Sequence, residues 1–579
     1  MAFSRRELFS GAAALLACPA FAQQRPQDDP IIAGFARHLP VLAENGMVAS
    51  QEMIASRIGV EILRQGGNAV DAAIATGFAL AVTLPRAGNI GGGGFMLIHL
   101  AAAKKTIAID YREMAGALAE RKMFLDAEGR FIPAKSQSTG LGVGVPGTVA
   151  GFALAHEEYG SKKFTLAQLI APAIKLAGEG IVVEDDLADS LPSGMRRMGR
   201  YASSREIFLK SDGTNYKRGD RLVQRDLARS LQLIADRGPR AFYEGEIADK
   251  IIAAVKAEGG HLTSDDFAAY RAIEREVVRG TYRGHEIVSM PPPSSGGVHL
   301  IEILNILEAF PIGDLGHNSA ATIHLMAEAM KLAYADRSKH LGDPDFTNIP
   351  LKGLLSKTYA NELRKTISLE RARPGADILP GQPQLFESEQ TTHYSVVDVQ
   401  GNAVSNTYTL NFSYGLGLVA AGTGVLLNNE LDDFAARENA PNAFGLLGGD
   451  ANAPGPRKRP LSSMSPSLVF RDGELRLVTG SPGGSRIITI VLQIIMNVID
   501  HKMNVAEATE APRIHHQWHP DQLRLEKGIS LDTQRLLEKL GHKLSVSAVI
   551  GSTQTIERAR GQLAGASDTR QRGTGVAGY

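Results

Sequence analysis

The chain has 579 residues, with 62 basic and 62 acidic side chains, and 44% of its residues are hydrophobic. A chain of this length is longer than one typical domain and can bury a large core. Because the charges balance, the composition does not favour an anionic membrane as a partner, and we expect no nucleic acid.

The first 22 residues are typical of an export signal. Arg5 and Arg6 precede a short apolar run over residues 8–17, and residues 20–22 form an A-x-A cleavage pattern. The paired arginines also resemble a twin-arginine signal, which exports folded proteins; a lipoprotein anchor at Cys18 is the alternative. Cys18 is the sole cysteine, so removal of residues 1–22 would leave no thiol. We therefore predict a periplasmic or secreted protein.

Hydrophobic spacing in the first two-thirds of the chain indicates helices and short strands. Residues 51–64 are predicted to form an amphipathic helix, and residues 69–83 a second, very apolar helix capped by Asn68. We expect strands over residues 95–100 and 106–110 and mainly helices over residues 160–280.

The stretch over residues 371–390 is rich in proline, glycine and charge, so we expect an exposed connector there. Beyond it the pattern changes to alternating strands joined by turns. Thr391–Asp398 and Ala403–Leu410 predict one hairpin, and Leu468–Arg471 and Glu474–Thr479 predict a second.

Thr391 begins the first of these strands, and our functional interpretation depends on it. A threonine hydroxyl is a weak nucleophile unless a base lies beside it, and the amine of the same residue can be that base. This amine exists only if the Gln390–Thr391 bond is cut, and its pKa would then be roughly 7.7–8.0. The hairpin register would bring Thr391 opposite residues 409–412, with Thr409 and Asn411 on one strand face. A threonine-rich edge hairpin without chemistry is the alternative.

A glycine-rich turn over residues 480–485 leads into an apolar helix expected over residues 486–499. The backbone N–H groups of Gly483 and Gly484 could approach a substrate oxygen, with a helix N-terminus behind them. Such donors stabilise the oxyanion of an acyl-transfer reaction. A phosphate loop is disfavoured because no lysine follows the glycines at the required spacing, and a purely structural turn stays open.

Other polar residues could bind the two ends of a charged ligand. Glu430 and Asp433 could hold an ammonium group or Ca²⁺, or belong to a solvated loop, although the usual Ca²⁺-loop spacing is missing. Ser462 and Ser463 offer hydroxyls to a carboxylate. Arg112 could pair with that carboxylate bidentately, or form an ordinary surface ion pair.

The histidines His393, His515 and His516 are expected to be structural. His515 and His516 are adjacent, so their side chains point apart, and no third ligand keeps metal spacing with them. We predict no metal and no cofactor.

Several segments together resemble the gamma-glutamyltranspeptidase family. They are TTHYSVVD at 391–398, NTYTLN at 406–411, NNELDDF at 428–434, RPLSSMSP at 459–466, TGSPGGSRI at 479–487, GGNAVDAA at 66–73, GNIGGGGFM at 88–96, DYREMA at 110–115, PPPSSGG at 291–297 and YADRSKHLGDPDF at 334–346. The resemblance covers nearly the whole mature chain, and so many long motifs in one order make it specific.

The resemblance implies an N-terminal nucleophile hydrolase. Its fold class would be α+β, a four-layer αββα sandwich built jointly from two processed subunits. The precursor would cut itself between Gln390 and Thr391 into a large subunit, residues 23–390, and a small subunit, residues 391–579, that form a heterodimer. Thr391 Oγ would attack the γ-carbonyl of glutathione or another gamma-glutamyl compound, and an acceptor amino acid, dipeptide or water would receive the acyl group.

The resemblance also implies a role for each remaining site residue. Thr409 would orient the nucleophile, and the backbone N–H groups of Gly483 and Gly484 would form the oxyanion hole. The groups that would bind the donor α-carboxylate are Arg112, Ser462 and Ser463, and those that would bind its α-ammonium are Asn411, Glu430 and Asp433.

Two positions depart from the family pattern. Bacterial relatives often carry glutamine where this chain has Glu430, and an acid there should hold an ammonium group at least as well. Residues 438–449 resemble the family's lid loop, but Phe444 replaces an aromatic residue whose hydroxyl latches the lid to the position of Asn411. We expect this lid to open more readily.

Two other functions compete with gamma-glutamyl transfer. A related amidase of the cephalosporin acylase type would accept glutaryl groups that lack the α-amine, but it would not need both Glu430 and Asp433. A homologue that is not processed could serve as a binding protein. The intact set of Thr391, Thr409, Gly483 and Gly484 argues against this.

Overall fold

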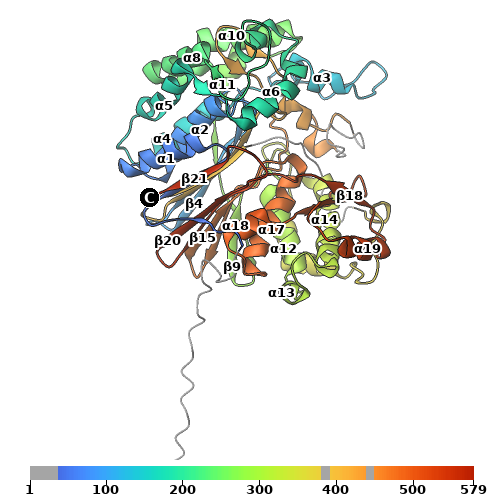
Figure 1. The fold of residues 1–579 in the computed structure, drawn as a ribbon. Coiled ribbons are helices and arrows are strands. Elements are labelled where there is room, and N and C mark those ends of the chain that lie inside the picture. The colour runs from blue at the N-terminus through green and yellow to red at the C-terminus, as the bar shows by residue number, and fades with distance from the viewer. Residues whose placement is uncertain (1–36, 380–391, 438–448) are drawn as a thin grey trace, which may run out of the picture.

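The computed structural model of the chain describes residues 37–379, 392–437 and 449–579. Gln390, Thr391, Phe444 and the predicted export signal lie outside these residues. The described chain has a mixed α/β fold built around two seven-stranded sheets whose neighbouring strands are all antiparallel (Figure 1).

The first sheet has the strand order β21-β2-β10-β11-β3-β4-β7. Its strands are β2 (Met47–Ser50), β3 (Gly93–Leu100), β4 (Lys105–Tyr111), β7 (Ile273–Arg275), β10 (Thr392–Val397), β11 (Ala403–Thr409) and β21 (Gly575–Gly578). β10 and β11 form the predicted hairpin, which pairs Thr392 with Tyr408 and lies between β2 and β3. Strands from before and after position 390 are therefore interleaved in one sheet.

The prediction that Asn411 shares a strand face with Thr409 is wrong. β11 ends at Thr409, and Asn411 has a φ of 73°, which lies in the left-handed region. Asparagine tolerates this conformation better than most residues because its short polar side chain can bond locally. The chain consequently turns directly after Thr409.

The second sheet has the order β1-β20-β19-β15-β14-β9-β8. Its strands are β1 (Val41–Ala43), β8 (Val278–Tyr282), β9 (His285–Ser289), β14 (Ser467–Arg471), β15 (Glu474–Thr479), β19 (Gln554–Ala559) and β20 (Gln562–Ser567). The predicted second hairpin, β14–β15, is confirmed, with positive φ values at Asp472 and Gly473 in its turn. The two sheets contact each other: the Ser405 hydroxyl donates to the Thr479 carbonyl at 3.1 Å.

Helices α1 (Met53–Arg64), α2 (Ala69–Thr83) and α4 (Thr148–Tyr159) pack on the first sheet. α2 has the predicted bounds, and Asn68 and Asp71 form a capping box at its start. All of its residues are buried, as expected for a helix that is apolar all round. The helices predicted within residues 160–280 are confirmed as α5 (Leu166–Glu179), α6 (Asp185–Met198), α7 (Ala202–Phe208), α8 (Arg225–Arg237), α9 (Arg240–Tyr243), α10 (Glu246–Ala257) and α11 (Ser264–Ala269).

A second group of helices lies on the opposite side of the two sheets, at the lower right of the folded part of the chain (Figure 1). It contains α12 (Gly296–Leu307), α14 (Ala320–His340), α17 (Ile487–Ile499) and α18 (Val505–Glu510). α17 is the predicted apolar helix, and it packs against α12. α19 (Leu531–Lys539) and β18 (Leu544–Ser547) lie beyond α14.

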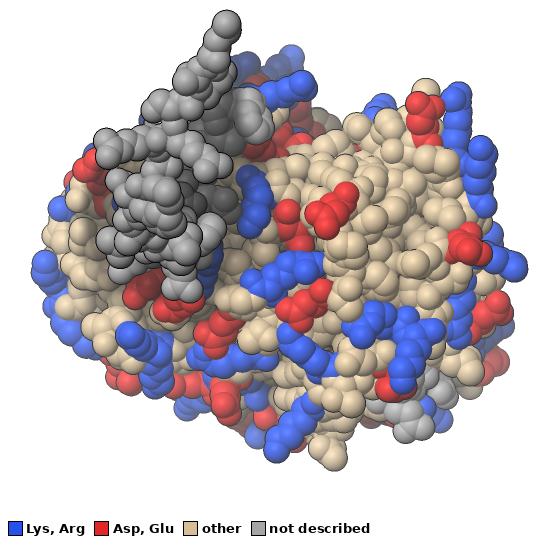
Figure 2. Space-filling model, turned by 90° about the horizontal axis from the view of Figure 1, so that it is seen from below, with Lys and Arg blue, Asp and Glu red and all other residues tan. Residues whose placement is uncertain are grey.

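The surface of the described chain carries charges of both signs. Basic and acidic side chains are interspersed over the face seen in Figure 2. Within residues 37–379, 392–437 and 449–579, no helix has the length and apolar character needed to cross a bilayer.

Candidate active site

Arg112 lies at the centre of a buried group of charges. Its Nη2 atom is 2.5 Å from Oδ2 of Asp433, and its Nη1 atom pairs with Oε1 of Glu430. Oε2 of Glu113 lies 3.8 Å from the same Nη1 atom. We call Arg112, Glu113, Glu430 and Asp433 the charge cluster. The structure thus brings three of the predicted ligand-binding residues into direct contact.

Hydrogen bonds to near and distant residues fix Arg112 in this position. The residue follows β4 directly, and its backbone N–H donates to Oδ1 of Asp110 at 3.0 Å. The Arg112 carbonyl accepts from the Tyr270 hydroxyl at 2.8 Å, and its Nε donates to the Pro460 carbonyl at 3.1 Å. Since each of these bonds restricts a rotatable group, the guanidinium is held in one orientation before a ligand arrives.

The two acids that pair with Arg112 come from a short 3₁₀ helix, Glu430–Asp433. Burial raises the pKa of Glu430, although the neighbouring Arg112 opposes this shift. Burial likewise raises the pKa of Glu113 to about 7, again against the effect of Arg112. One arginine therefore faces three carboxyl groups, and the protonation of Glu113 is balanced near neutral pH.

The segment that carries the two predicted serines contacts the charge cluster through a backbone carbonyl. Arg112 Nη2 donates to the Leu461 carbonyl at 3.3 Å, one residue before Ser462. The Ser463 hydroxyl accepts from Nη2 of Arg337 at 3.1 Å and lies 3.3 Å from the Ser295 hydroxyl. Arg337, a buried arginine on α14, therefore polarises the Ser463 hydroxyl by donating a hydrogen bond to it.

Thr409 and Asn411 are joined to each other and to the acidic segment. The Asn411 backbone N–H donates to Thr409 Oγ1 at 2.8 Å, and Asn411 Nδ2 donates to the Asn429 carbonyl at 2.9 Å. Asn429 directly precedes Glu430. The turn after β11 thus links the predicted orienting hydroxyl to the charge cluster.

The predicted oxyanion turn has the backbone conformation that only glycine adopts readily. Gly483 has a φ of 141° and Gly484 a φ of 58°. A Cβ on Gly483 would lie 3.0 Å from Cδ1 of Ile490 on α17. The same turn approaches β10, because a Cβ on Gly480 would lie 2.4 Å from Cε1 of His393. The described residues include no direct bond between Gly483 or Gly484 and the charge cluster.

The histidines expected to be structural have bonds of that kind. His393 Nδ1 lies 2.9 Å from Thr407 Oγ1, and His515 Nδ1 lies 2.9 Å from Thr489 Oγ1. Burial lowers the pKa of His393 to about 3, so its ring is neutral at pH 7. His516 pairs with Asp521 at 3.3 Å.

The sequence interpretation missed Glu113, Ser295 and Arg337. Glu113 was adjacent to Arg112 in the chain, so its acidity was the available signal. Ser295 lies in the PPPSSGG segment, whose Ser294 bridges to Ser462. Arg337 lies in the family-like segment at 334–346, but the sequence did not indicate its contact with Ser463, because the two residues are 126 positions apart.

Comparisons with known proteins agree with this fold and show the family of the chain. Residues 55–578 match the gamma-glutamyltranspeptidase family. The glutathione hydrolase proenzyme of Escherichia coli (strain K12) is 52% identical over 572 residues, which covers 98% of each chain. The glutathione hydrolase proenzyme of Pseudomonas sp. (strain A14) is 48% identical and covers 94% of this chain and 96% of its own.

Among solved structures, the cephalosporin acylase from Bacillus halodurans has a TM-score of 0.83 at 29% identity, covering 95% of this chain and 99% of its own. Fold, site and relatives together define an enzyme of the hydrolase and transferase class. The chain belongs to the gamma-glutamyltranspeptidase family.

Proposed function

We propose that this enzyme is a gamma-glutamyltransferase and glutathione hydrolase that cuts its own chain before Thr391. The large subunit would span residues 23–390 and the small subunit residues 391–579, and the two would remain together as a heterodimer. The names of its relatives, which are glutathione hydrolase proenzymes, support both parts of this proposal.

The reaction would proceed in two acyl-transfer steps. The α-amine of Thr391 takes the proton of the Thr391 hydroxyl as Oγ attacks the γ-carbonyl of the donor. The C–N bond then breaks, the proton passes to the leaving amine, and a gamma-glutamyl ester remains on Oγ. Water or the amine of an amino acid or dipeptide attacks this ester and releases the product. The N–H groups of Gly483 and Gly484 would stabilise the oxyanion, and Thr409 would orient Thr391.

The charge cluster is the observation that carries the choice of donor. In a gamma-glutamyl group the α-carboxylate and the α-ammonium are attached to one carbon, so groups that bind them must be neighbours. Arg112 lies in contact with both Glu430 and Asp433. We propose that Arg112, Ser462 and Ser463 bind the carboxylate, while Asn411, Glu430 and Asp433 bind the ammonium. A donor with both charges then replaces part of the ion pairing that it disrupts.

The finer features of the fold belong to the same proposal. Two facing sheets with a helix group on either side support the four-layer αββα sandwich of the N-terminal nucleophile hydrolases. The N-terminal pattern over residues 1–22 supports export to the periplasm or medium. Residues 438–449 would act as a lid over the site.

A glutaryl amidase is the second candidate, because a cephalosporin acylase shares the fold. The two functions are separated by measuring the release of p-nitroaniline from γ-glutamyl p-nitroanilide beside its glutaryl analogue. We expect a strong preference for the γ-glutamyl compound, since a glutaryl group leaves Glu430 and Asp433 without a cationic ligand. A preference for the glutaryl compound would reject the proposed donor.

The nucleophile is tested separately with Thr391→Ala. Wild-type protein should give two bands on a denaturing gel, and the variant should give one band and no turnover. An active wild-type sample that consists of a single unbroken chain would refute self-cleavage.

A further inference from the structure

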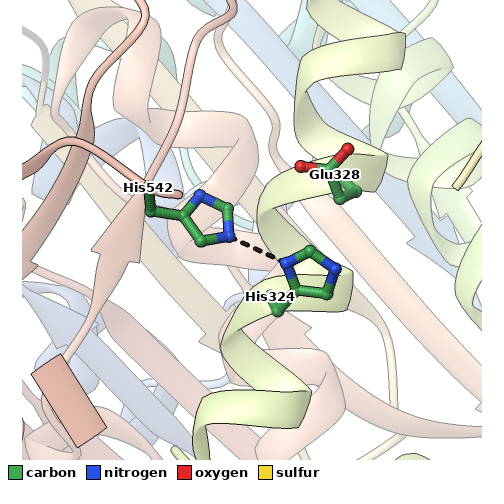
Figure 3. Close-up of side chains that lie close together, drawn as sticks. All are labelled: His324, Glu328 and His542. Carbon is green, nitrogen blue, oxygen red and sulfur yellow. Dashed lines mark hydrogen bonds between the residues drawn. The ribbon is translucent and has the colours of Figure 1, made fainter. Parts of the chain in front are cut away.

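A buried group of three metal-ligating side chains lies outside the proposed active site. His324 and Glu328 are one turn apart on α14, so both point to the same side of this helix. His542 approaches them from the segment between α19 and β18 (Figure 3). We call these three residues the histidine–glutamate cluster. Their exposed fractions are 1%, 2% and 6%, respectively, so the cluster is shielded from solvent.

The ligand atoms of the cluster lie close to one another. One atom from each side chain lies within 4.8 Å of the others, and His324 Nδ1 is 2.8 Å from His542 Nε2. Tetrahedral zinc with nitrogen and oxygen ligands at about 2.0–2.1 Å requires ligand atoms about 3.3 Å apart. The two rings need to separate by only about half an ångström to meet this requirement.

A hydrogen bond selects the form of His324 that binds a metal. Its Nε2 atom lies 2.7 Å from the Ser368 carbonyl oxygen, which can only accept. The proton is therefore on Nε2, and the lone pair of Nδ1 points toward His542 Nε2. Donation from the second ring nitrogen to a backbone carbonyl is how histidine ligands are oriented in metal sites.

The charged group nearest to the cluster is Lys331, and it affects both His542 and Glu328. Burial, with Lys331 nearby, lowers the pKa of His542 to about 3, so its ring is a neutral ligand at pH 7. The Lys331 ammonium lies 2.5 Å from Oε1 of Glu328 and also donates to the Arg373 carbonyl. The Arg373 backbone N–H also donates to both Glu328 oxygens, at 3.3 Å each. Each carboxylate oxygen has more than one acceptor position, so Glu328 can keep these donors and still offer a lone pair to a cation.

We propose that His324 Nδ1, His542 Nε2 and one carboxylate oxygen of Glu328 bind a divalent transition-metal ion, best matched by Zn²⁺. Imidazole nitrogens with one carboxylate suit zinc and its neighbours, whereas Ca²⁺ and Mg²⁺ require oxygen ligands. The proton on His542 Nε2 moves to Nδ1 of the same ring when the metal binds. The ion joins α14 to the segment before β18 and is structural, so it takes no part in the acyl transfer.

The proposal is tested on the full-length protein after chelation and removal of the chelator. Isothermal titration with ZnCl₂ should show stoichiometric uptake, and the midpoint temperature of unfolding should rise with Zn²⁺. His542→Gln keeps an N–H donor for His324 but removes a ligand, and Glu328→Gln removes the negative charge. Each variant should bind Zn²⁺ at least ~100-fold more weakly, because loss of an outer-shell partner alone costs roughly 10–100-fold.

His501→Gln is the matched control. His501 forms another histidine pair, with His317, at a ring-centroid distance of 5.2 Å, so the control variant should bind Zn²⁺ like wild type. Co²⁺ bound to wild type by the three side chains and one water molecule should give the visible bands of a four-coordinate site. This readout does not depend on the variants folding. Absence of stoichiometric Zn²⁺ uptake by wild type, or equal uptake by all variants, would overturn the proposal.

Discussion

Arg112 and Asp433 are 321 positions apart in the sequence, yet Arg112 Nη2 lies 2.5 Å from Asp433 Oδ2. Both side chains are buried, with exposed fractions of 1% and 4%, so water screens their attraction only weakly. Removing Arg112 would take the positive charge away from two buried carboxyl groups, those of Asp433 and Glu430. The ion pair also crosses position 390, so it would join the two proposed subunits at the site itself.

Replacing Arg112 with lysine should lower kcat/KM for γ-glutamyl p-nitroanilide by on the order of 100-fold. Lysine keeps the positive charge, but a single ammonium cannot contact Glu430 and Asp433 in the geometry of a guanidinium. Arg130→Lys is the control, because Arg130 is largely exposed and pairs with Asp126 at the surface. Equal kinetics for the Arg112 variant and wild type would remove the charge cluster from donor binding.

Glu113 should make the enzyme less stable as the pH rises from about 4.5 to 7. The pKa of its carboxyl in the folded protein is about 7, above its ordinary value of 4.5, so between these values the folded state holds more protons than the unfolded state. The free energy of unfolding therefore falls with increasing pH over this range.

Glu113→Gln should flatten the decline of the midpoint temperature of unfolding between pH 5 and pH 7.5. Glu128→Gln changes an exposed side chain and should leave the wild-type slope unchanged. A Glu113 variant with the same slope as wild type would show that its carboxyl does not titrate in this range.

Gly483→Ala should lower kcat by on the order of 10²–10³-fold, the usual effect of losing an oxyanion donor. Alanine keeps the backbone N–H, but a shifted turn no longer directs it at the oxyanion. A side chain at a φ of 141° strains the backbone, and the turn must shift to relieve contact with Ile490. Gly473→Ala is matched, since Gly473 has a φ of 80° with open space around it, in a hairpin turn. It should lose about 1–2 kcal/mol of stability and keep its kcat. If both variants keep full kcat, the glycine turn is structural.

Phe444→Tyr should lower the ratio of hydrolysis to transfer. Phe444 lies outside the described residues, and this prediction rests on the family resemblance, in which an aromatic hydroxyl latches the lid to the position of Asn411. One restored hydrogen bond is worth about 1 kcal/mol, enough to change the closed fraction of the lid several-fold. The ratio is measured with and without a dipeptide acceptor, and Phe346→Tyr, at an exposed phenylalanine, serves as the control. An unchanged ratio would speak against the latch.

Elements with strong local signals could be predicted from the sequence. α2 begins and ends where the Asn68 cap and the apolar run predict, and the β14–β15 hairpin follows its Asp472–Gly473 turn. Such features depend on neighbours in the chain, so a single sequence contains the needed information.

Contacts between distant segments could not be predicted in the same way. The approach of Arg337 to Ser463 depends on how α14 packs, and periodicity says nothing about that partner. The direct pairing of Arg112 with Glu430 and Asp433 was equally absent from the sequence interpretation, which placed their charges at opposite ends of a ligand. The bend at Asn411 was missed because a strand pattern continued through Leu410, while the backbone turns after Thr409.

The interleaving of strands in the first sheet has a consequence for the stability of the protein after the proposed cleavage before Thr391. β10 and β11 are hydrogen-bonded on both sides to β2 and β3, which belong to the other part of the chain. Pulling the fragments apart would expose unpaired backbone amides and carbonyls on these strands and on β21, which pairs with β2. Unpaired strand edges of this kind drive aggregation. Cleavage before Thr391 would therefore leave the two parts hydrogen-bonded to each other. Fragments that are expressed separately should precipitate unless they associate during folding.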